Sequence, residues 1–247
     1  ESKINEDIIE NVEIQEVTQQ AYSNLEKIEN AWFFDTIKEK GVLMTTNLDH
    51  YRQMLEQPWG NIQYEMTFAQ LAHLENKQIL DFGAGFGLTS EFLSKKNTVI
   101  AVEPNEEMLL ADKTHTFKKL VGSLEVLADF PDQSFDIICC HNVLEYIAPE
   151  ERPHYLAHFK RLLRTNGLLS IIKHNQVGKV IQSVVFHNDV NTALELLKSQ
   201  EFNSPSFTQG STYTIDELVD MSQLELEKYL AIRSFYSLQP NEFKTQP

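Results

Sequence analysis

The sequence predicts an α/β fold in which a mostly parallel sheet is flanked by helices and preceded by an N-terminal helical extension. Short apolar runs typical of buried strands occur at Ile79–Phe82, Val99–Val102, Phe117–Val121, Phe135–Cys140 and Leu168–Ile172. Helical patterns lie between or after them, at Thr89–Lys95, Glu106–Lys113, Val143–Ile147 and Arg152–Leu163. Strands that alternate with helices form βαβ units, and such units make a parallel sheet.

The length of 247 residues suits one such domain with an added piece. We expect residues 1–59 to form the helical extension, as a lid or partner surface, and residues 60–247 to form the main domain. Residues 1–31 contain eight acidic and two basic residues, with apolar residues near helical spacing, which predicts an acidic amphipathic helix. An aromatic packing anchor is expected at 32–34. A second helical pattern around Tyr51 is broken at Pro58-Trp59-Gly60, and a third runs from Ile62 to Leu74.

The last third of the chain is less regular. Asp189–Ser199 has helical spacing, and Thr214 with Glu217 fits a capping box for a helix that we expect to reach Leu230. Asn166-Gly167 is expected to mark the stop before the fifth strand. No convincing final strand precedes Pro247, so an antiparallel closing pair would have to lie in 202–214 and 230–238, or else the chain is shortened.

Composition and charge exclude some functions. The formal net charge of −15 disfavours a broad electrostatic hold on nucleic acid or on anionic membrane. No apolar run approaches the ~18 residues of a membrane span, and no N-terminal signal pattern is visible, so we expect a cytoplasmic protein. The neighbouring Cys139 and Cys140 predict two buried thiols in a reducing compartment, and no spacing typical of metal ligands occurs.

One local group of basic residues runs against the acidic balance. It comprises Arg152, His154, His158, Lys160, Arg161 and Arg164, with Lys173, His174 and Lys179 soon after. Two interpretations stay open: a solvated helix face, or a landing patch for a phosphate backbone.

A glycine-rich turn follows the first predicted strand. Gly83, Gly85 and Gly87 give the pattern GxGxG, and glycines permit positive φ angles and a close approach of ligand to backbone. The dinucleotide fingerprint GxGxxG would need glycine or alanine where Leu88 stands. Asp81 lies directly ahead of the turn, which favours a cationic ligand over a pyrophosphate.

A second carboxylate strengthens the signal. Glu103 follows Asp81 by 22 residues and ends the next apolar run. A carboxylate at that strand end can accept hydrogen bonds from both hydroxyls of a ribose. The alternative is a plain strand-turn-helix with a surface glutamate.

These motifs resemble those of class I S-adenosylmethionine-dependent methyltransferases. "ILDFGAGFG" resembles their first motif and "VEPNEEML" their second. "FPDQSFDIICCHNVLEYI" and "LLRTNGLLSIIKHN" resemble the segments around their fourth and fifth strands. The resemblance covers about residues 60–175 and implies a Rossmann-like domain with a cofactor core at about 76–175 and S-adenosylmethionine as cofactor.

The resemblance also implies roles for individual residues. Gly83 and Gly85 would contact the methionine part of the cofactor, Asp81 would orient its ammonium and Glu103 its ribose. The loop from Ser123 to Glu125 would meet the adenine. His141 would face the cofactor or the acceptor, or else be a polar residue at a helix start. The implied cofactor-binding set is Asp81, Gly83, Ala84, Gly85, Gly87, Glu103, Pro104, Ser123, Leu124, Glu125 and His141.

Methyl transfer from a sulfonium needs positioning more than a dedicated base, unless the nucleophile starts protonated. The sequence has no Asn-Pro-Pro-Tyr motif, which argues against methylation of the adenine amino group. It has no Pro-Cys pair after the fourth strand, which argues against cysteine-dependent attack on pyrimidine carbon 5. The function expected is methyl transfer to an oxygen or nitrogen of a small molecule. Trp59, Tyr64 and Phe68 would cap the pocket or merely pack their helix.

A finer resemblance concerns "CHNVLEYI" and "HNQVGKVIQSVVFHNDV", which are similar to tRNA wobble-uridine carboxymethoxy methyltransferases that form a methyl ester. It implies tRNA as an alternative acceptor, with His141, Tyr146, His174 and Asn175 on the acceptor side. His141, Tyr146 and His174 are the candidate catalytic residues. Two rivals remain: an NAD-dependent dehydrogenase, and a non-catalytic cofactor-binding module that uses its acidic helix to bind a partner.

Overall fold

The computed structural model describes residues 48, 51–53, 55–111, 116–185, 187–203 and 209–232. The acidic helix predicted at 1–31 and the aromatic anchor at 32–34 lie outside the described residues. None of the helices in the described part of the chain is both long enough and apolar enough to cross a bilayer.

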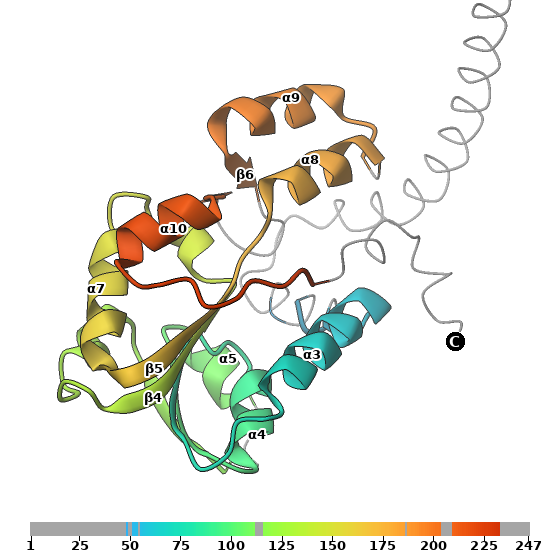
Figure 1. Ribbon diagram of the computed structural model, residues 1–247. Helices are drawn as coiled ribbons and strands as arrows, with labels where there is room; N and C mark the ends of the chain where they lie inside the picture. The colour runs from blue at the N-terminus through green and yellow to red at the C-terminus, as the bar shows by residue number, and fades with distance from the viewer. Residues whose placement is uncertain are drawn as a thin grey trace, which may run out of the picture.

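Five parallel strands form the central sheet (Figure 1). They are β1 (Gln78–Phe82), β2 (Thr98–Glu103), β3 (Lys118–Val121), β4 (Phe135–His141) and β5 (Leu163–Ile172), in the order β3-β2-β1-β4-β5. The parallel sheet predicted from the sequence is therefore confirmed. The chain reverses its direction of winding between β1 and β4, and ligands of such sheets bind in the crevice beyond the carboxyl ends of the strands at that point.

Helices cover both faces of the sheet (Figure 1). One core lies beneath α3 (Pro58–Leu71), α4 (Leu88–Ser94) and α5 (Glu106–Leu110), and the other beneath α6 (Leu124–Leu127) and α7 (Arg152–Leu162). Cys139 belongs to the first core and Cys140 to the second, because neighbouring strand residues point to opposite faces. Burial raises the pKa of both thiols, which suits the predicted inert, reduced cysteines.

Several element boundaries differ from the predictions. α3 begins at Pro58 and not at Ile62, since a proline fits the first turn of a helix, where its missing N–H costs nothing. The segment at Val143–Ile147 is a single 3₁₀ turn, η1 (Leu144–Tyr146). β5 begins at Leu163, so Asn166-Gly167 lies within the strand, where Asn166 has a φ of 63° and the register with β4 shifts.

The segment after β5 returns to the sheet's carboxyl edge through α8 (Gln176–Val185), α9 (Val190–Ser199), β6 (Glu201–Asn203), β7 (Gln209–Ser211) and α10 (Ile215–Ser222). The predicted capping box at Thr214 and Glu217 is confirmed. The prediction that this helix reaches Leu230 is wrong, because Gln223 at φ 53° ends it. β6 and β7 pair antiparallel as a separate two-stranded sheet.

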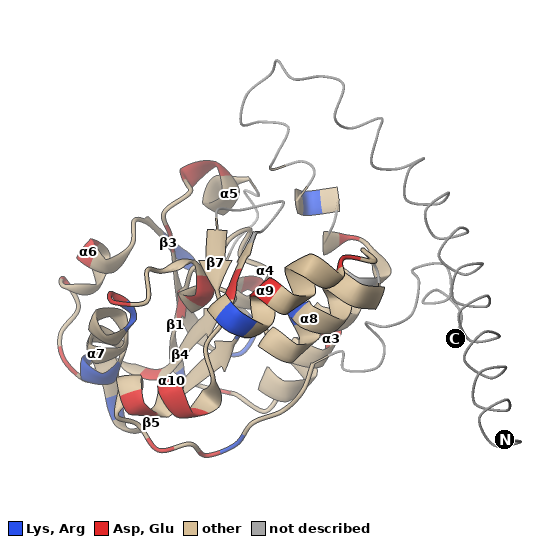
Figure 2. Cartoon of the chain, turned by 90° about the horizontal axis from the view of Figure 1, so that it is seen from above, with Lys and Arg blue, Asp and Glu red and all other residues tan. Residues whose placement is uncertain are grey.

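The basic group at α7 serves mostly as a set of internal donors, although Figure 2 shows it as the most basic helix in view, against acidic residues on α5, α6 and α10. Arg161 donates to the carbonyls of Leu127 and Phe130, and Lys160 donates to the carbonyl of Gln223. Arg164 pairs with Asp136 at 3.0 Å. These contacts favour the interpretation of a structural helix face over a phosphate landing patch.

Arg152 connects the end of β4 to the C-terminal segment. Its side chain is buried, and its Nε donates to the carbonyls of Leu144 (2.9 Å) and Ile147 (3.1 Å). Its Nη2 donates to the carbonyl of Ser211 at 3.0 Å, and the guanidinium lies 5.0 Å from the ring centre of Tyr213.

We predict that Arg152→Leu lowers the free energy of unfolding by about 2–4 kcal/mol, because buried carbonyls lose their donor. Arg164→Leu is the matched control: its guanidinium is about half exposed, and its pair should contribute under about 1 kcal/mol. Urea denaturation followed by circular dichroism measures both. Equal, small losses in the two variants would contradict the anchoring role of Arg152.

Candidate functional site

The turn after β1 lies against the end of β2. The amide groups of Gly83 and Ala84 donate to the carbonyl of Val102 at 2.8 and 3.1 Å. Gly83, Gly85 and Gly87 have φ angles of 72°, 55° and 79°, which side chains other than glycine rarely adopt. The predicted glycine turn is therefore a left-handed turn at the carboxyl edge of the sheet, at the crossover point.

Two of these glycines also lack space for a side chain. A Cβ on Gly83 would lie 2.2 Å from Cγ2 of Val143, and one on Gly87 would lie 2.9 Å from the ring of Phe117. At Gly85 the nearest atom would be the methyl of Met108 at 3.3 Å. Gly83 thus brings the segment after β4 directly against the turn, and Gly85 brings the turn close to Met108 of α5.

Glu103 joins this turn to the start of α5. Its Oε2 accepts a hydrogen bond from the amide of Gly85 at 2.9 Å, and its Oε1 accepts one from the amide of Asn105 at 3.0 Å. The Asn105 side chain in turn caps α5 by accepting from the amide of Met108. A carboxylate has about four acceptor positions, so Glu103 can still accept from a pair of ligand hydroxyls.

Asp81 lies buried under the turn, with 3% of its surface exposed. Burial raises the pKa of its carboxyl to about 6, the charge of Glu103 adds to that rise, and the Ser90 hydroxyl, which donates at 2.6 Å, opposes it. Two carboxylates therefore approach the same crevice, and a cationic ligand group would relieve their repulsion.

The loop after β3 lies next to Glu103. Gly122 donates its amide to the carbonyl of Glu103 at 3.1 Å, and its φ of 150° leaves no space for a Cβ beside Val126. Ser123 donates its amide to the carboxylate of Glu125 at 2.7 Å, which lowers the pKa of that carboxyl. The loop predicted from Ser123 to Glu125 is wrong in extent, because Leu124 and Glu125 already belong to α6 and Ser123 is the residue that precedes this helix. Gly122, which the sequence analysis missed, fixes the start of this segment beside the end of β2.

His141 is the last residue of β4 and not the start of a helix. Its Nε2 lies 2.9 Å from the Ser170 hydroxyl of β5, and its buried Nδ1 has no hydrogen-bond partner among the described residues. Burial lowers the pKa of His141 to about 4, so the ring is neutral at pH 7.

Tyrosines approach the crevice from the N-terminal side. Tyr51 stacks on Phe86 of the glycine turn with ring centres 5.9 Å apart. Burial raises the pKa of Tyr51, and the nearby Tyr64, Tyr146 and Glu103 raise it further. Burial with the charge of Asp81 raises the pKa of Tyr64 to about 12. Both tyrosines therefore lie close to the carboxylates at the carboxyl edge of the sheet. Sequence reasoning placed Tyr51 only on a helix face and missed this position.

The three aromatic residues predicted to cap the pocket differ in role. Burial raises the pKa of Tyr64 and the charge of Asp81 adds to the rise, so Tyr64 lies near Asp81 and its capping role stays a prediction. Phe68 stacks on Phe92 of α4 with ring centres 4.3 Å apart, which is helix packing. The structure does not describe the side chain of Trp59.

The carboxyl ends of β4 and β5 bring a further group together. Glu145 in η1 is 1% exposed, and its Oε1 lies 3.2 Å from Nδ1 of His174, just after β5. Tyr146 and His174 both pack edge-on against the ring of Phe202 in β6. Of the predicted catalytic candidates, His174 thus has a buried acidic neighbour that sequence reasoning missed.

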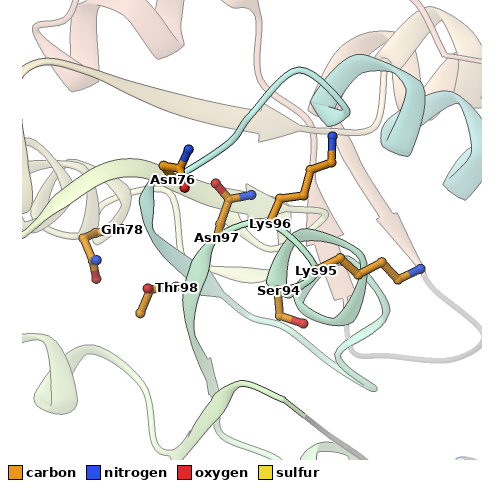
Figure 3. A pocket seen from close by; sticks show the side chains of 7 residues that line it. All are labelled: Asn76, Gln78, Ser94, Lys95, Lys96, Asn97 and Thr98. Carbon is orange, nitrogen blue, oxygen red and sulfur yellow. The ribbon is translucent and has the colours of Figure 1, made fainter.

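A recess of about 520 Å³ lies at the opposite edge of the sheet (Figure 3). Its lining comprises Asn76, Gln78, Ser94, Lys95, Lys96, Asn97 and Thr98. Gln78 and Thr98 are the first residues of β1 and β2, so the recess lies far from the glycine turn along the strands. The Asn97 side chain is already bonded to the backbone of Leu74, Lys77 and Leu93, which is a structural role.

Comparison with known proteins agrees with this geometry. The model of a protein family described as "Methyltransferase domain" matches residues 80–171, from β1 to β5. A ubiquinone biosynthesis O-methyltransferase of Rhizobium leguminosarum is 28% identical over 120 residues, 46% of each chain. One of Coxiella burnetii is 31% identical over 86 residues, 32% of this chain and 36% of that protein. The chain spans less than half the length of these curated relatives.

Solved structures give similar matches. The PH0226 protein of Pyrococcus horikoshii is 14% identical over 70% of this chain and 80% of its own, with a TM-score of 0.48. An S-adenosylmethionine-dependent methyltransferase of Archaeoglobus fulgidus is 21% identical over 42% of this chain and 50% of its own, with a TM-score of 0.38.

The family match runs over the strands that carry the glycine turn, Asp81 and Glu103, and the parallel sheet with helices on both faces is the Rossmann-like fold that the resemblance implied. Residues 80–171 thus match a methyltransferase domain, in agreement with the resemblance to class I S-adenosylmethionine-dependent methyltransferases noted in the sequence.

Proposed function

We propose that this domain transfers the methyl group of S-adenosylmethionine to an oxygen atom of a small-molecule acceptor. The observation that carries the proposal is the contact of Gly83 with Val143, which brings the segment after β4 against the glycine turn. His141 and Glu145 lie in that segment, so polar side chains adjoin the place where a methyl donor would be held.

The cofactor would be held by residues that the fold already fixes. In this proposal Glu103 accepts from the ribose hydroxyls and Asp81 attracts the ammonium group, while the turn Gly83-Ala84-Gly85-Phe86-Gly87 approaches the methionine part. Pro104 and the loop Ser123-Leu124-Glu125 adjoin the adenosine, and His141 lies toward the methyl group. The two buried carboxylates beside the glycine turn fit a cationic, ribose-bearing ligand.

When bound, S-adenosylmethionine supplies an already activated methyl group, so the protein contributes mainly position and exclusion of water. Tyr51 and Tyr64 suit that task, since both side chains are half-buried and burial raises the pKa of both phenol groups.

The small-molecule acceptor is supported by three features. The curated relatives are, by their printed names, O-methyltransferases of ubiquinone biosynthesis. The net charge is −15, and the arginines of α7 are engaged internally. Formation of a methyl ester on tRNA stays a second prediction, carried by the placement of His141, Tyr146 and His174 near the same strand ends.

A pH dependence tests the role of Asp81. With a pKa near 6, this carboxyl is charged at pH 7.5 and becomes protonated as the pH falls toward 5. We predict that the affinity for S-adenosylhomocysteine, which keeps the ammonium group, falls up to about tenfold over that range. The same titration of Asp81→Asn should be nearly flat.

Ser90→Ala sharpens this test, because loss of the hydroxyl that donates to Asp81 should move the midpoint of the affinity change to higher pH. Isothermal titration calorimetry measures all three proteins. An unchanged pH dependence in Asp81→Asn would remove Asp81 from the ammonium site.

Transfer of labelled methyl from S-adenosylmethionine tests the reaction itself. The protein is incubated in parallel with total tRNA and with a small-molecule extract, and we expect label in the small-molecule fraction as an ether or ester. Alkali-labile label in tRNA would instead establish the ester-forming alternative. Cofactor binding without label in either fraction would support a non-catalytic, cofactor-binding module.

A further inference from the structure

Glu145 is a buried carboxylate that the cofactor site does not use. It lies in η1 directly after β4, with 1% of its surface exposed. Its Oε1 accepts from the backbone amide of His174 at 3.3 Å and lies 3.2 Å from Nδ1 of the same residue. Its buried Oε2 has no hydrogen-bond partner in the part of the chain that the structure describes. Oε1 thus lies beside both the backbone and the ring of His174, at ion-pair distance from Nδ1 but without a hydrogen bond between these two atoms.

The basic groups around Glu145 have other contacts of their own. Lys173 donates to the carbonyl of His174 and lies 4.6 Å from the ring centre of Tyr213. Lys179 of α8 lies 4.3 Å from the ring centre of Phe202, and Arg152 of α7 is bonded to backbone carbonyls. Burial raises the pKa of Glu145, and Lys173 and Lys179 partly oppose that rise. The two lysines favour the charged form of Glu145. Neither lysine takes the place of His174 beside its Oε1.

His174 has the position of an acceptor-side residue. It follows β5, the strand next to β4, and its side chain is about one third exposed. Its ring meets Phe202 edge-on, with ring centres 5.5 Å apart, which restricts how it can turn. A carboxylate beside Nδ1 holds that nitrogen protonated and leaves Nε2 as a proton acceptor, and it stabilises the imidazolium that forms. Such pairs are often loosely aligned before substrate binds.

We propose that Glu145 and His174 form the proton-accepting pair of the acceptor site, and that the methyl acceptor is therefore a hydroxyl group. The proposal rests on the proposed function and names its substrate class. His174 is the catalytic residue, and Glu145 is a positioning residue that acts through it.

The step balances without any further reactant. The acceptor oxygen forms a bond to the methyl carbon while the bond from that carbon to the sulfonium sulfur breaks. The hydroxyl proton passes to Nε2 of His174, and the electron pair of its O–H bond stays on the oxygen. The products are a methyl ether and S-adenosylhomocysteine. A carboxylate acceptor is already anionic at neutral pH and would need no such base.

Two acceptors that differ mainly in acidity test the base. Catechol keeps its proton at neutral pH, whereas 4-nitrocatechol is largely ionised. We expect His174→Gln to lower kcat on catechol by about 10²–10⁴-fold and on 4-nitrocatechol by less than about tenfold. His187→Gln, an exposed histidine in the same segment, is the matched control and should leave both rates unchanged. Affinity for S-adenosylhomocysteine should stay within about twofold in both variants.

Glu145→Gln keeps the shape of the side chain and removes its charge. We expect kcat on catechol to fall and the acid limb of its pH profile to move to lower pH, because the imidazole becomes a weaker base. A purely structural role would lower kcat without moving that limb. In parallel, NMR follows the imidazole signal of His174 as the pH changes. The signal is assigned by its absence in His174→Gln, and its titration midpoint should be lower in Glu145→Gln than in the wild type.

The outcomes separate the two levels of the proposal. If the wild-type protein methylates catechol and His174→Gln does so equally well, or if the NMR titration ignores Glu145→Gln, the proton-accepting pair is overturned. If the wild-type protein labels carboxylates and no hydroxyl compound, the pair is overturned while the oxygen-directed function stands; if it labels no oxygen of any compound in a metabolite extract, that function fails as well. Equal losses on both catechols would also overturn the pair, since an ionised acceptor needs no base.

Discussion

The carboxylate of Glu103 is the contact on which the cofactor crevice depends. One oxygen holds the amide of Gly85 in the turn after β1, and the other holds the amide of Asn105, which caps α5. The carbonyl of the same residue receives the amide of Gly122 and so fixes the loop after β3. A single residue at the end of β2 thus sets three neighbouring loops, and each oxygen of its carboxylate keeps acceptor capacity for a ligand.

The charges of the crevice explain why it suits a sulfonium nucleotide and not a dinucleotide. Asp81 and Glu103 approach the same space, and the charge of Glu103 is one cause of the raised pKa of Asp81. Burial raises the pKa of both tyrosines on the N-terminal side, and the charge of Asp81 adds to the rise at Tyr64 and that of Glu103 to the rise at Tyr51. A pyrophosphate would add negative charge to this group, whereas an ammonium or sulfonium relieves it.

The sequence predicted the sheet and the glycine turn because both depend on local patterns. Apolar runs marked all five strands, and the glycines between Asp81 and Leu88 marked the left-handed turn after β1. The acceptor side depends on tertiary contacts that no local spacing reveals. Glu145 resembles an ordinary polar residue of a short helix, and its meeting with His174 follows only once β4 and β5 are neighbours. The boundary errors at Pro58 and Gln223 have local causes, a proline that starts a helix and a left-handed residue that ends one.

The most direct measurement is the affinity of S-adenosylhomocysteine for Glu103→Gln, by isothermal titration calorimetry. Glu107→Gln, at an exposed position of α5, is the matched control. Loss of the charge weakens hydrogen bonds from the ribose and from both backbone amides. The account predicts about a 10–100-fold weaker affinity, with Glu107→Gln unchanged. A folded Glu103→Gln protein that binds within about twofold of the wild type would contradict the central role of this carboxylate.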